Sequence, residues 1–140
     1  MKRYIVVFAL VFIQINSLFA QDIIGDWELD NGSIVNIYRE ADLIYGKIVK
    51  VAEYVNGRKV PDTDINNPDC SKRHKSLNGL VVLQGLKKED CKYTGGRIYD
   101  PESGNTYYCS MEVKNDILIV TGSIDKRGIL KRTMKWCRYK

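Results

Sequence analysis

Short runs rich in Ile, Val and Tyr recur along residues 23–138, and breaks of Gly, Asn, Asp or Pro separate most of them. Within the runs apolar and polar residues alternate, and apolar residues never keep a helical period for three turns. The pattern therefore predicts eight strands and an all-β fold. The expected strands are residues 23–29, 33–39, 43–54, 80–86, 96–100, 105–114, 117–124 and 129–138.

The breaks predict how these strands connect. Residues 30–32, 100–104, 115–116 and 125–128 have the composition of tight turns. Short links make sequential strands antiparallel, and closing an eight-stranded meander removes its exposed edges. We therefore expect an antiparallel up-and-down eight-stranded barrel with one long loop, whose interior holds side chains or one small ligand.

Alternation along a strand also predicts which side chains face the interior. In the strand 129–138 it places Arg132 among apolar neighbours, which costs free energy unless a partner pairs with it or stacks on it. The expected inward sets are Tyr107, Cys109, Met111 and Val113 on one strand, and Leu130, Arg132, Met134 and Trp136 on another.

Residues 1–20 have the features of a secretory signal peptide: a basic start, an apolar run over residues 4–13 and a small residue, Ala20, at the end. The alternative, a membrane anchor, is disfavoured because a span needs about 20 apolar residues. We expect a single mature domain, residues 21–140, in the periplasm or outside the cell. Losing Lys2 and Arg3 lowers the formal charge from +5 to +3, which removes the argument for a nucleic-acid partner.

If the protein is exported, its four cysteines predict two disulfides, because an even number of cysteines in an oxidising compartment favours disulfide bonds. The turns place residue 105 opposite 100, 117 opposite 114 and 129 opposite 124, which separates Cys109 from Cys137. We therefore favour Cys70 with Cys109 and Cys91 with Cys137. Cys70 would then pin residues 55–79, a long polar segment that we interpret as a lid or side flap.

The same segment raises the question of a metal site. Asp62, Asp64, Asn66 and Asp69 resemble the opening of a calcium loop, but Asn67 stands where the EF-hand pattern needs glycine and Arg73 where it needs glutamate. Asx turns explain the same residues. The wide cysteine spacing and the basic neighbours of His74 also disfavour zinc. We expect neither a metal nor another cofactor.

Enzyme chemistry finds little support in the sequence, which lacks an HExxH motif, a P-loop, a Gly-x-Gly-x-x-Gly motif and a plausible Ser-His-Asp set. We therefore expect no enzyme. Basic residues gather at 72–75 and between 126 and 140. In an exported protein they would meet envelope anions at most peripherally, and a solvated barrel surface explains them equally.

Several motifs together resemble one bacterial family, known as domain of unknown function 2147. They are residues 33–38 (SIVNIY), 46–49 (GKIV), 66–69 (NNPD), 77–80 (LNGL) with 83–86 (LQGL), 95–101 (GGRIYDP) with 104–107 (GNTY), and 132–136 (RTMKW). The resemblance implies an exported protein of Gram-negative bacteria, a small lipocalin-like barrel and no established activity. The chain departs from the family at Tyr93, where tryptophan is usual, and in its cysteines, so no disulfide pairing carries over.

Residues 25–27 (GDW) also resemble the Gly-x-Trp of lipocalins, whose tryptophan closes the barrel and is covered by an arginine from the last strand. The resemblance assigns that covering role to Arg132.

Two hypotheses follow. The first is binding of a small apolar or amphipathic ligand inside the barrel; the second is an envelope protein-interaction or surface module with a filled core, which uses its basic face or residues 55–79. The candidate cavity residues are Trp27, Tyr45, Tyr99, Tyr107, Met111, Arg132, Met134 and Trp136.

Overall fold

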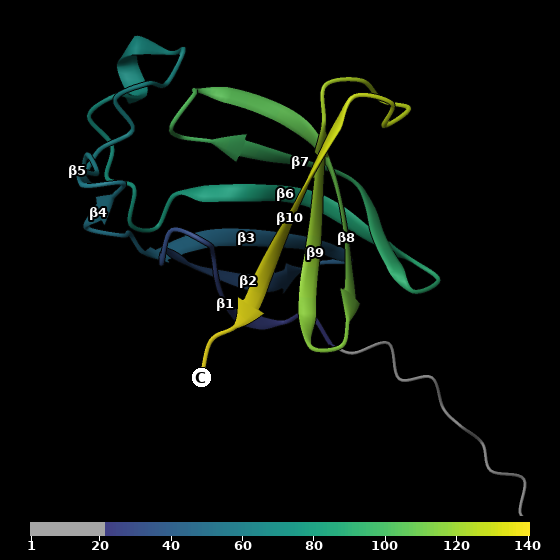
Figure 1. Ribbon diagram of the computed structural model, residues 1–140. Helices are drawn as coiled ribbons and strands as arrows, with labels where there is room; N and C mark the ends of the chain where they lie inside the picture. Colours follow the sequence, from purple (N-terminus) through teal and green to yellow (C-terminus); the bar gives the residue numbers. More distant parts are fainter. Residues whose placement is uncertain (1–21) are drawn as a thin grey trace, which may run out of the picture.

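The computed structural model describes residues 22–140, and the expected signal peptide lies outside the described residues (Figure 1). Apart from one short 3₁₀ helix, the regular elements are strands. Among the described residues no helix is long and apolar enough to cross a bilayer. In chain order the elements are β1 (Gly25–Glu28), β2 (Ile34–Glu40), β3 (Leu43–Lys50), β4 (Tyr54–Val55), β5 (Arg58–Lys59), η1 (Cys70–Lys72), β6 (Val81–Glu89), β7 (Lys92–Asp100), β8 (Asn105–Lys114), β9 (Ile117–Ser123) and β10 (Lys131–Arg138).

Eight of the strands form a closed antiparallel barrel in the order β1-β10-β9-β8-β7-β6-β3-β2. Each strand of the meander pairs with its neighbour in sequence, and β1 pairs with β10 to close the ring. The expected up-and-down barrel is confirmed. The remaining two strands, β4 and β5, form a separate hairpin within residues 51–80, which we call the flap and which stands to one side of the barrel at the upper left of Figure 1.

The two ends of the barrel differ in their connections. At one end, the closed end, tight turns join β2 to β3, β6 to β7 and β8 to β9. Asn115 and Asp116 in the last of these both have positive φ, as a two-residue type I′ turn requires. The flap and the other connections lie at the opposite end, the flap end.

The hairpin β6–β7 is longer than the sequence pattern predicted. Its pairing continues through Lys87 opposite Thr94 to Glu89 opposite Lys92, beyond the expected strands 80–86 and 96–100. A tight turn with positive φ at Asp90 allows this extension. The charged composition of residues 87–92 obscures the strand because these positions are largely exposed and need no apolar residues.

The register between β9 and β10 differs from the expected one by one residue. Ser123 lies opposite Lys131, and the Ile124 N–H donates to the Leu130 carbonyl, whereas the sequence placed residue 129 opposite 124. The cause is Asp125, whose carboxylate accepts hydrogen bonds from the N–H groups of Leu130 (2.9 Å) and Ile129 (3.1 Å). These bonds lengthen the loop and lower the pKa of the Asp125 carboxyl group.

Apolar side chains fill the barrel at its closed end. Trp27 is fully buried there, and its indole N–H donates to the Ile23 carbonyl at 2.9 Å. Layers of aliphatic residues pack above it, because inward positions of neighbouring strands alternate with outward polar ones. The surrounding core includes Ile37, Ile44, Leu86, Tyr93, Met111, Leu118 and Val120.

Arg138, rather than Arg132, covers Trp27. Its guanidinium carbon lies 4.3 Å from the centre of a Trp27 ring, and its nitrogens donate to the carbonyls of Asp22 (2.7 Å) and Ile24 (3.4 Å). The expected role of Arg132 is therefore wrong. The register explains why, because Trp27 is the partner of Arg138 across β1 and β10, while Arg132 lies six residues away toward the flap end.

Replacing Arg138 should test the importance of this seal. We expect Arg138→Ala to lower the free energy of unfolding by about 1–2 kcal/mol, because it removes a cation–π contact and two charge-assisted hydrogen bonds. Arg132→Ala is the matched control and should change it by less than about 0.5 kcal/mol. Urea unfolding followed by tryptophan fluorescence measures both. Equal losses in the two variants would contradict the assignment.

Candidate functional site

A cavity of about 1060 Å³ occupies the flap end of the barrel. Its wall is mostly apolar, and Trp136 lies among the lining residues with 2% of its surface exposed. The remaining apolar wall residues come from strands on several sides of the barrel and from the flap. They include Val35, Ile48, Leu77, Val82, Ile98 and Met134.

Gly122 helps to keep this end of the barrel empty. It continues the inward face of β9, on which Leu118 and Val120 are fully buried. A Cβ atom added at Gly122 would lie 3.6 Å from Ile98 and 3.7 Å from Tyr107, which is ordinary contact. Both residues line the cavity, so a larger side chain at this position would extend into it. The barrel is therefore packed beneath this level and hollow at it.

Cationic side chains predominate at the cavity mouth. Arg58 and Lys59 reach it from the flap, and Lys131 and Arg132 from the start of β10. Within residues 22–140 the ion pairs join Lys72 to Asp69 and Lys114 to Glu112, so these four cations take part in none. The carboxylates of Asp100 and Glu102 also line the mouth. The Asp100 carboxylate accepts hydrogen bonds within its own turn, from the Glu102 N–H and the Ser103 hydroxyl.

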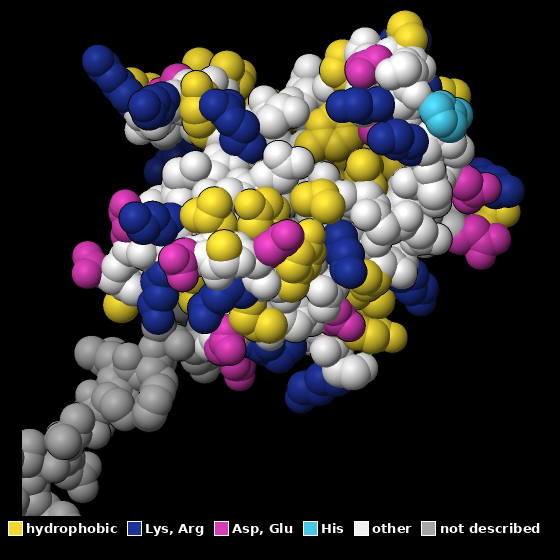
Figure 2. Space-filling model, turned by 180° about the vertical axis from the view of Figure 1, so that it is seen from behind, with side chains coloured by type: hydrophobic (Ala, Val, Ile, Leu, Met, Phe, Trp, Pro, Cys, Tyr) yellow, Lys and Arg dark blue, Asp and Glu magenta, His cyan; other side chains and the backbone are white. Residues whose placement is uncertain are grey.

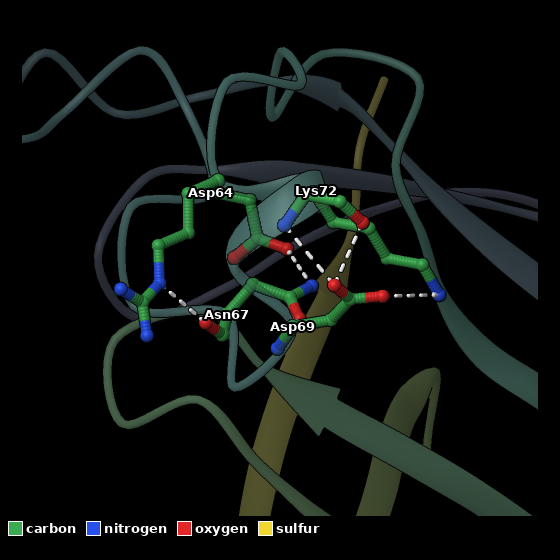
Figure 3. A network of polar contacts seen from close by, with 6 residues as sticks. Asp64, Asn67, Asp69 and Lys72 are labelled. Atoms are coloured by element: carbon green, nitrogen blue, oxygen red, sulfur yellow. Dashed lines mark hydrogen bonds and ion pairs between the residues drawn. The ribbon is translucent and has the colours of Figure 1, made fainter.

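A buried aspartate anchors the flap to the barrel. Asp64 is 1% exposed, and its carboxylate accepts a hydrogen bond of 2.7 Å from the Tyr99 hydroxyl on β7 and another of 2.7 Å from the Asn67 side chain. Figure 3 shows the second of these bonds within the polar network around Asp64, Asn67, Asp69 and Lys72. Burial of Tyr99, reinforced by the Asp64 hydrogen bond, raises the pKa of its phenol well above the usual 10.0.

A second flap residue, Asn66, reaches the β7–β8 turn. The Asn66 amide donates to the carbonyls of Glu102 (2.9 Å) and Pro101 (3.3 Å). Gly104, with φ of +74°, permits this close approach, since a Cβ there would collide with the Asn66 carbonyl. The hydrogen bonds of Asp64 and Asn66 therefore hold the flap over one side of the mouth.

Comparison with known proteins agrees with this architecture. The bacterial family DUF2147, described as "Uncharacterized protein conserved in bacteria", matches residues 25–138. The chain belongs to this family. It is also similar to a solved structure described as "Protein HP1028 from the human pathogen Helicobacter pylori belongs to the lipocalin family", with 27% identity and a TM-score of 0.74 over 85% of this chain and 84% of that chain. Comparison with curated proteins finds no match.

In this DUF2147 barrel the residues suggested for calcium have separate roles. Asp64 faces Tyr99, and Asn66 faces the β7–β8 turn. Asp69 caps η1 by accepting from the Ser71 hydroxyl (2.7 Å) and N–H (3.0 Å), which lowers the pKa of its carboxyl group. Among residues 22–140 no three His, Cys, Asp or Glu side chains gather as a metal site would need, and these residues stabilise the flap instead.

All four cysteines are free thiols in the structure, which contains neither of the expected disulfides. Cys109 is 4% exposed inside the barrel, opposite Gly96 and Gly122, whereas Cys70 is exposed on η1 in the flap. Cys91 and Cys137 are both exposed at the closed end, but β8 and β9 separate their strands in the ring. Hydrogen bonds of Asp64 and Asn66 hold the flap in this structure.

The structure brings together five of the eight candidate cavity residues: Tyr99, Tyr107, Arg132, Met134 and Trp136 all line the cavity. Trp27 and Met111 lie in the packed core instead. Tyr45 lies opposite Tyr38 on β2 and stacks on its ring, with centroids 5.9 Å apart, and neither lines the cavity. Arg58 and Lys59 also line the cavity but are not among the residues expected from the sequence, because no strand pattern places flap residues relative to the barrel.

Thiol labelling should distinguish the four cysteines. Burial raises the pKa of the Cys109 thiol to about 12, so this side chain is protonated and shielded at neutral pH. In the reduced native protein we expect Cys70, Cys91 and Cys137 to react with Ellman's reagent and Cys109 to react only after unfolding. Cys109→Ser should titrate the same three thiols. Recovery of a peptide linking Cys70 to Cys109 from native protein would contradict this arrangement.

Replacing Tyr99 should test how the flap is anchored. Tyr99→Phe leaves a buried Asp64 oxygen without its donor, and we expect a loss of about 1–3 kcal/mol in unfolding free energy. Because the pKa of Tyr99 is raised on folding, its contribution is complete below the unfolded pKa and is lost as pH rises through the folded value. The loss begins at the unfolded pKa of about 10, so wild type should lose more stability than Tyr99→Phe as pH rises above about 10. Tyr54→Phe, an exposed flap position, is the control; equal pH profiles for wild type and Tyr99→Phe would refute the role.

Proposed function

We propose that this protein binds a small apolar or amphipathic molecule in the cavity at the flap end. The observation that carries the proposal is the cavity volume of about 1060 Å³ with a largely apolar wall. Ligand pockets typically measure about 300–1,000 Å³ and are mainly apolar with a few polar groups. A cavity of this kind suits burial of one small molecule.

The polar groups of the wall support an apolar or amphipathic ligand over a polar one. The Tyr99 hydroxyl donates to Asp64, and the Ser33 hydroxyl accepts from the Ala52 N–H at 3.0 Å. These groups are therefore already engaged within the protein. Binding would depend mainly on burial of apolar surface, worth about 25 cal/mol per Å².

The alternative, an interaction module with a filled core, fits less well because the barrel is hollow at the flap end. Part of its proposed basic face also has internal partners. Arg73 donates to the Asn67 carbonyl at 2.7 Å, and Arg138 covers Trp27. Similarity to a barrel described as a lipocalin supports the binding proposal at the level of fold.

Binding also fits the lining better than catalysis does. The residues that line the cavity include neither histidine nor cysteine, and their two carboxylates, Asp100 and Glu102, lie in the turn at the mouth. A paired acid and base facing the interior would be expected for hydrolytic chemistry. We therefore propose a binding protein.

Filling the cavity should test the proposal. The uncharged fluorescent probe N-phenyl-1-naphthylamine should bind wild type, and Gly122→Val should weaken its affinity by about tenfold or more, because valine places methyl groups in the cavity. Valine is favoured in strands, so Gly122→Val should still fold, which circular dichroism would show.

The matched control is Thr121→Val, which introduces the same residue at the adjacent outward position of β9. It should bind the probe like wild type. Equal affinity for wild type and Gly122→Val would show that the probe does not occupy the cavity, and an absence of binding to wild type would refute the proposal.

A further inference from the structure

We propose that the ligand is an anionic amphiphile, whose apolar tail lies in the cavity and whose carboxylate or phosphate head is held at the mouth by Arg132 with Arg58, Lys59 and Lys131. This inference rests on the proposed function and adds the chemical class of the ligand.

Arg132 is the central residue because of its register. It lies on the same face of β10 as Met134 and Trp136, and all three line the cavity. Its partner across the strand pair is Gly122, which has no side chain. The guanidinium group therefore stands where the apolar wall ends and solvent begins, with open space beside it.

The charges of the mouth favour an anion. Arg132, Lys131, Arg58 and Lys59 form no ion pair within the described residues, and the Asp100 carboxylate is hydrogen-bonded in its own turn. Four cations against two carboxylates leave an excess of positive charge at the opening. A guanidinium group offers a planar fork of donors that matches carboxylate or phosphate oxygens, and a long cationic ligand would be repelled.

The cations also come from two separately anchored segments. Arg58 and Lys59 belong to the flap, which Asp64 and Asn66 fix to β7 and the β7–β8 turn. Lys131 and Arg132 begin β10, after the loop that Asp125 organises. A head group between them could therefore contact cations from both segments without a large rearrangement.

Exposed apolar side chains next to these cations complete an amphipathic rim. Ile124, Ile129 and Leu130 in the β9–β10 loop are 69%, 72% and 65% exposed and line the same cavity. Figure 2 shows yellow and dark blue side chains together on this loop, at the upper left of the view. An apolar tail that enters the barrel would pass this collar before it reaches the deeper wall.

Ligands with identical twelve-carbon tails test the inference. Dodecanoate, dodecyl phosphate, 1-dodecanol and dodecyltrimethylammonium would each compete with N-phenyl-1-naphthylamine below their micelle concentrations. We expect at least one anion to bind about tenfold more tightly than the alcohol, and the cation to bind most weakly. The better of the two anions identifies a free carboxylate or a phosphate head as the source. The advantage of the anion should also shrink at high salt.

Arg132→Gln should remove most of the advantage of the anion over the alcohol while leaving 1-dodecanol binding unchanged. Lys135→Gln, an exposed outward position of the same strand, removes the same charge and should behave like wild type. Arg58→Gln provides a second variant on a different segment, should Arg132→Gln fail to fold.

The outcomes separate the two proposals. Equal binding of anion and alcohol by wild type, or preference for the cation, would overturn the inference and leave the proposed function standing. If none of the four ligands displaces the probe in wild type, the inference would be overturned, whereas the proposed function would still be decided by probe binding to wild type and Gly122→Val. An equal loss of anion binding in Lys135→Gln and Arg132→Gln would attribute the effect to overall charge and would also overturn the inference.

Discussion

The closure between β1 and β10 is the constraint on which the rest of the structure depends. β1 is four residues long and pairs with β10 at Trp27 opposite Arg138 and Glu28 opposite Cys137. So few backbone pairs leave the seam dependent on side chains for stability. The cation–π contact between the Arg138 guanidinium and the buried Trp27 indole provides this stabilisation. Without closure, the edges of β1 and β10 would be exposed and available for pairing with other chains.

This seal at one end leaves room for a cavity at the other. Large side chains such as Trp27, Met111 and Leu118 fill the closed end, so the barrel does not depend on contents at the flap end for its stability. There, Gly122 contributes no volume, and the flap rather than a further layer of core covers one side. The molecule thus separates a packed half from a hollow half, and the four cations of the mouth, which form no ion pair within residues 22–140, stand at the boundary with solvent.

Sequence reasoning succeeded where the physical signal was local. Alternation placed Cys109, Met111, Met134 and Trp136 inward, because side chains of a strand point to opposite faces whatever its partners are. It failed where distant residues had to be placed. The Asp125 hydrogen bonds shifted the β10 register by one residue, and Arg138 took the position over Trp27. Asp64 was noticed as an acidic residue, but its partner Tyr99 lies 35 residues away along the chain.

The sequence by itself determined the fold class, the closed meander of eight strands, the inward faces and the family, because strand alternation, turn residues and motifs are read from neighbouring positions. Only the tertiary structure decided that the barrel is hollow at the flap end, that hydrogen bonds through Asp64 and Asn66 hold the flap, and that four cations surround the mouth. The physical reason is that a cavity is the volume left over when side chains from several strands and a flap meet. Packing in three dimensions sets that remainder, and no single segment encodes it.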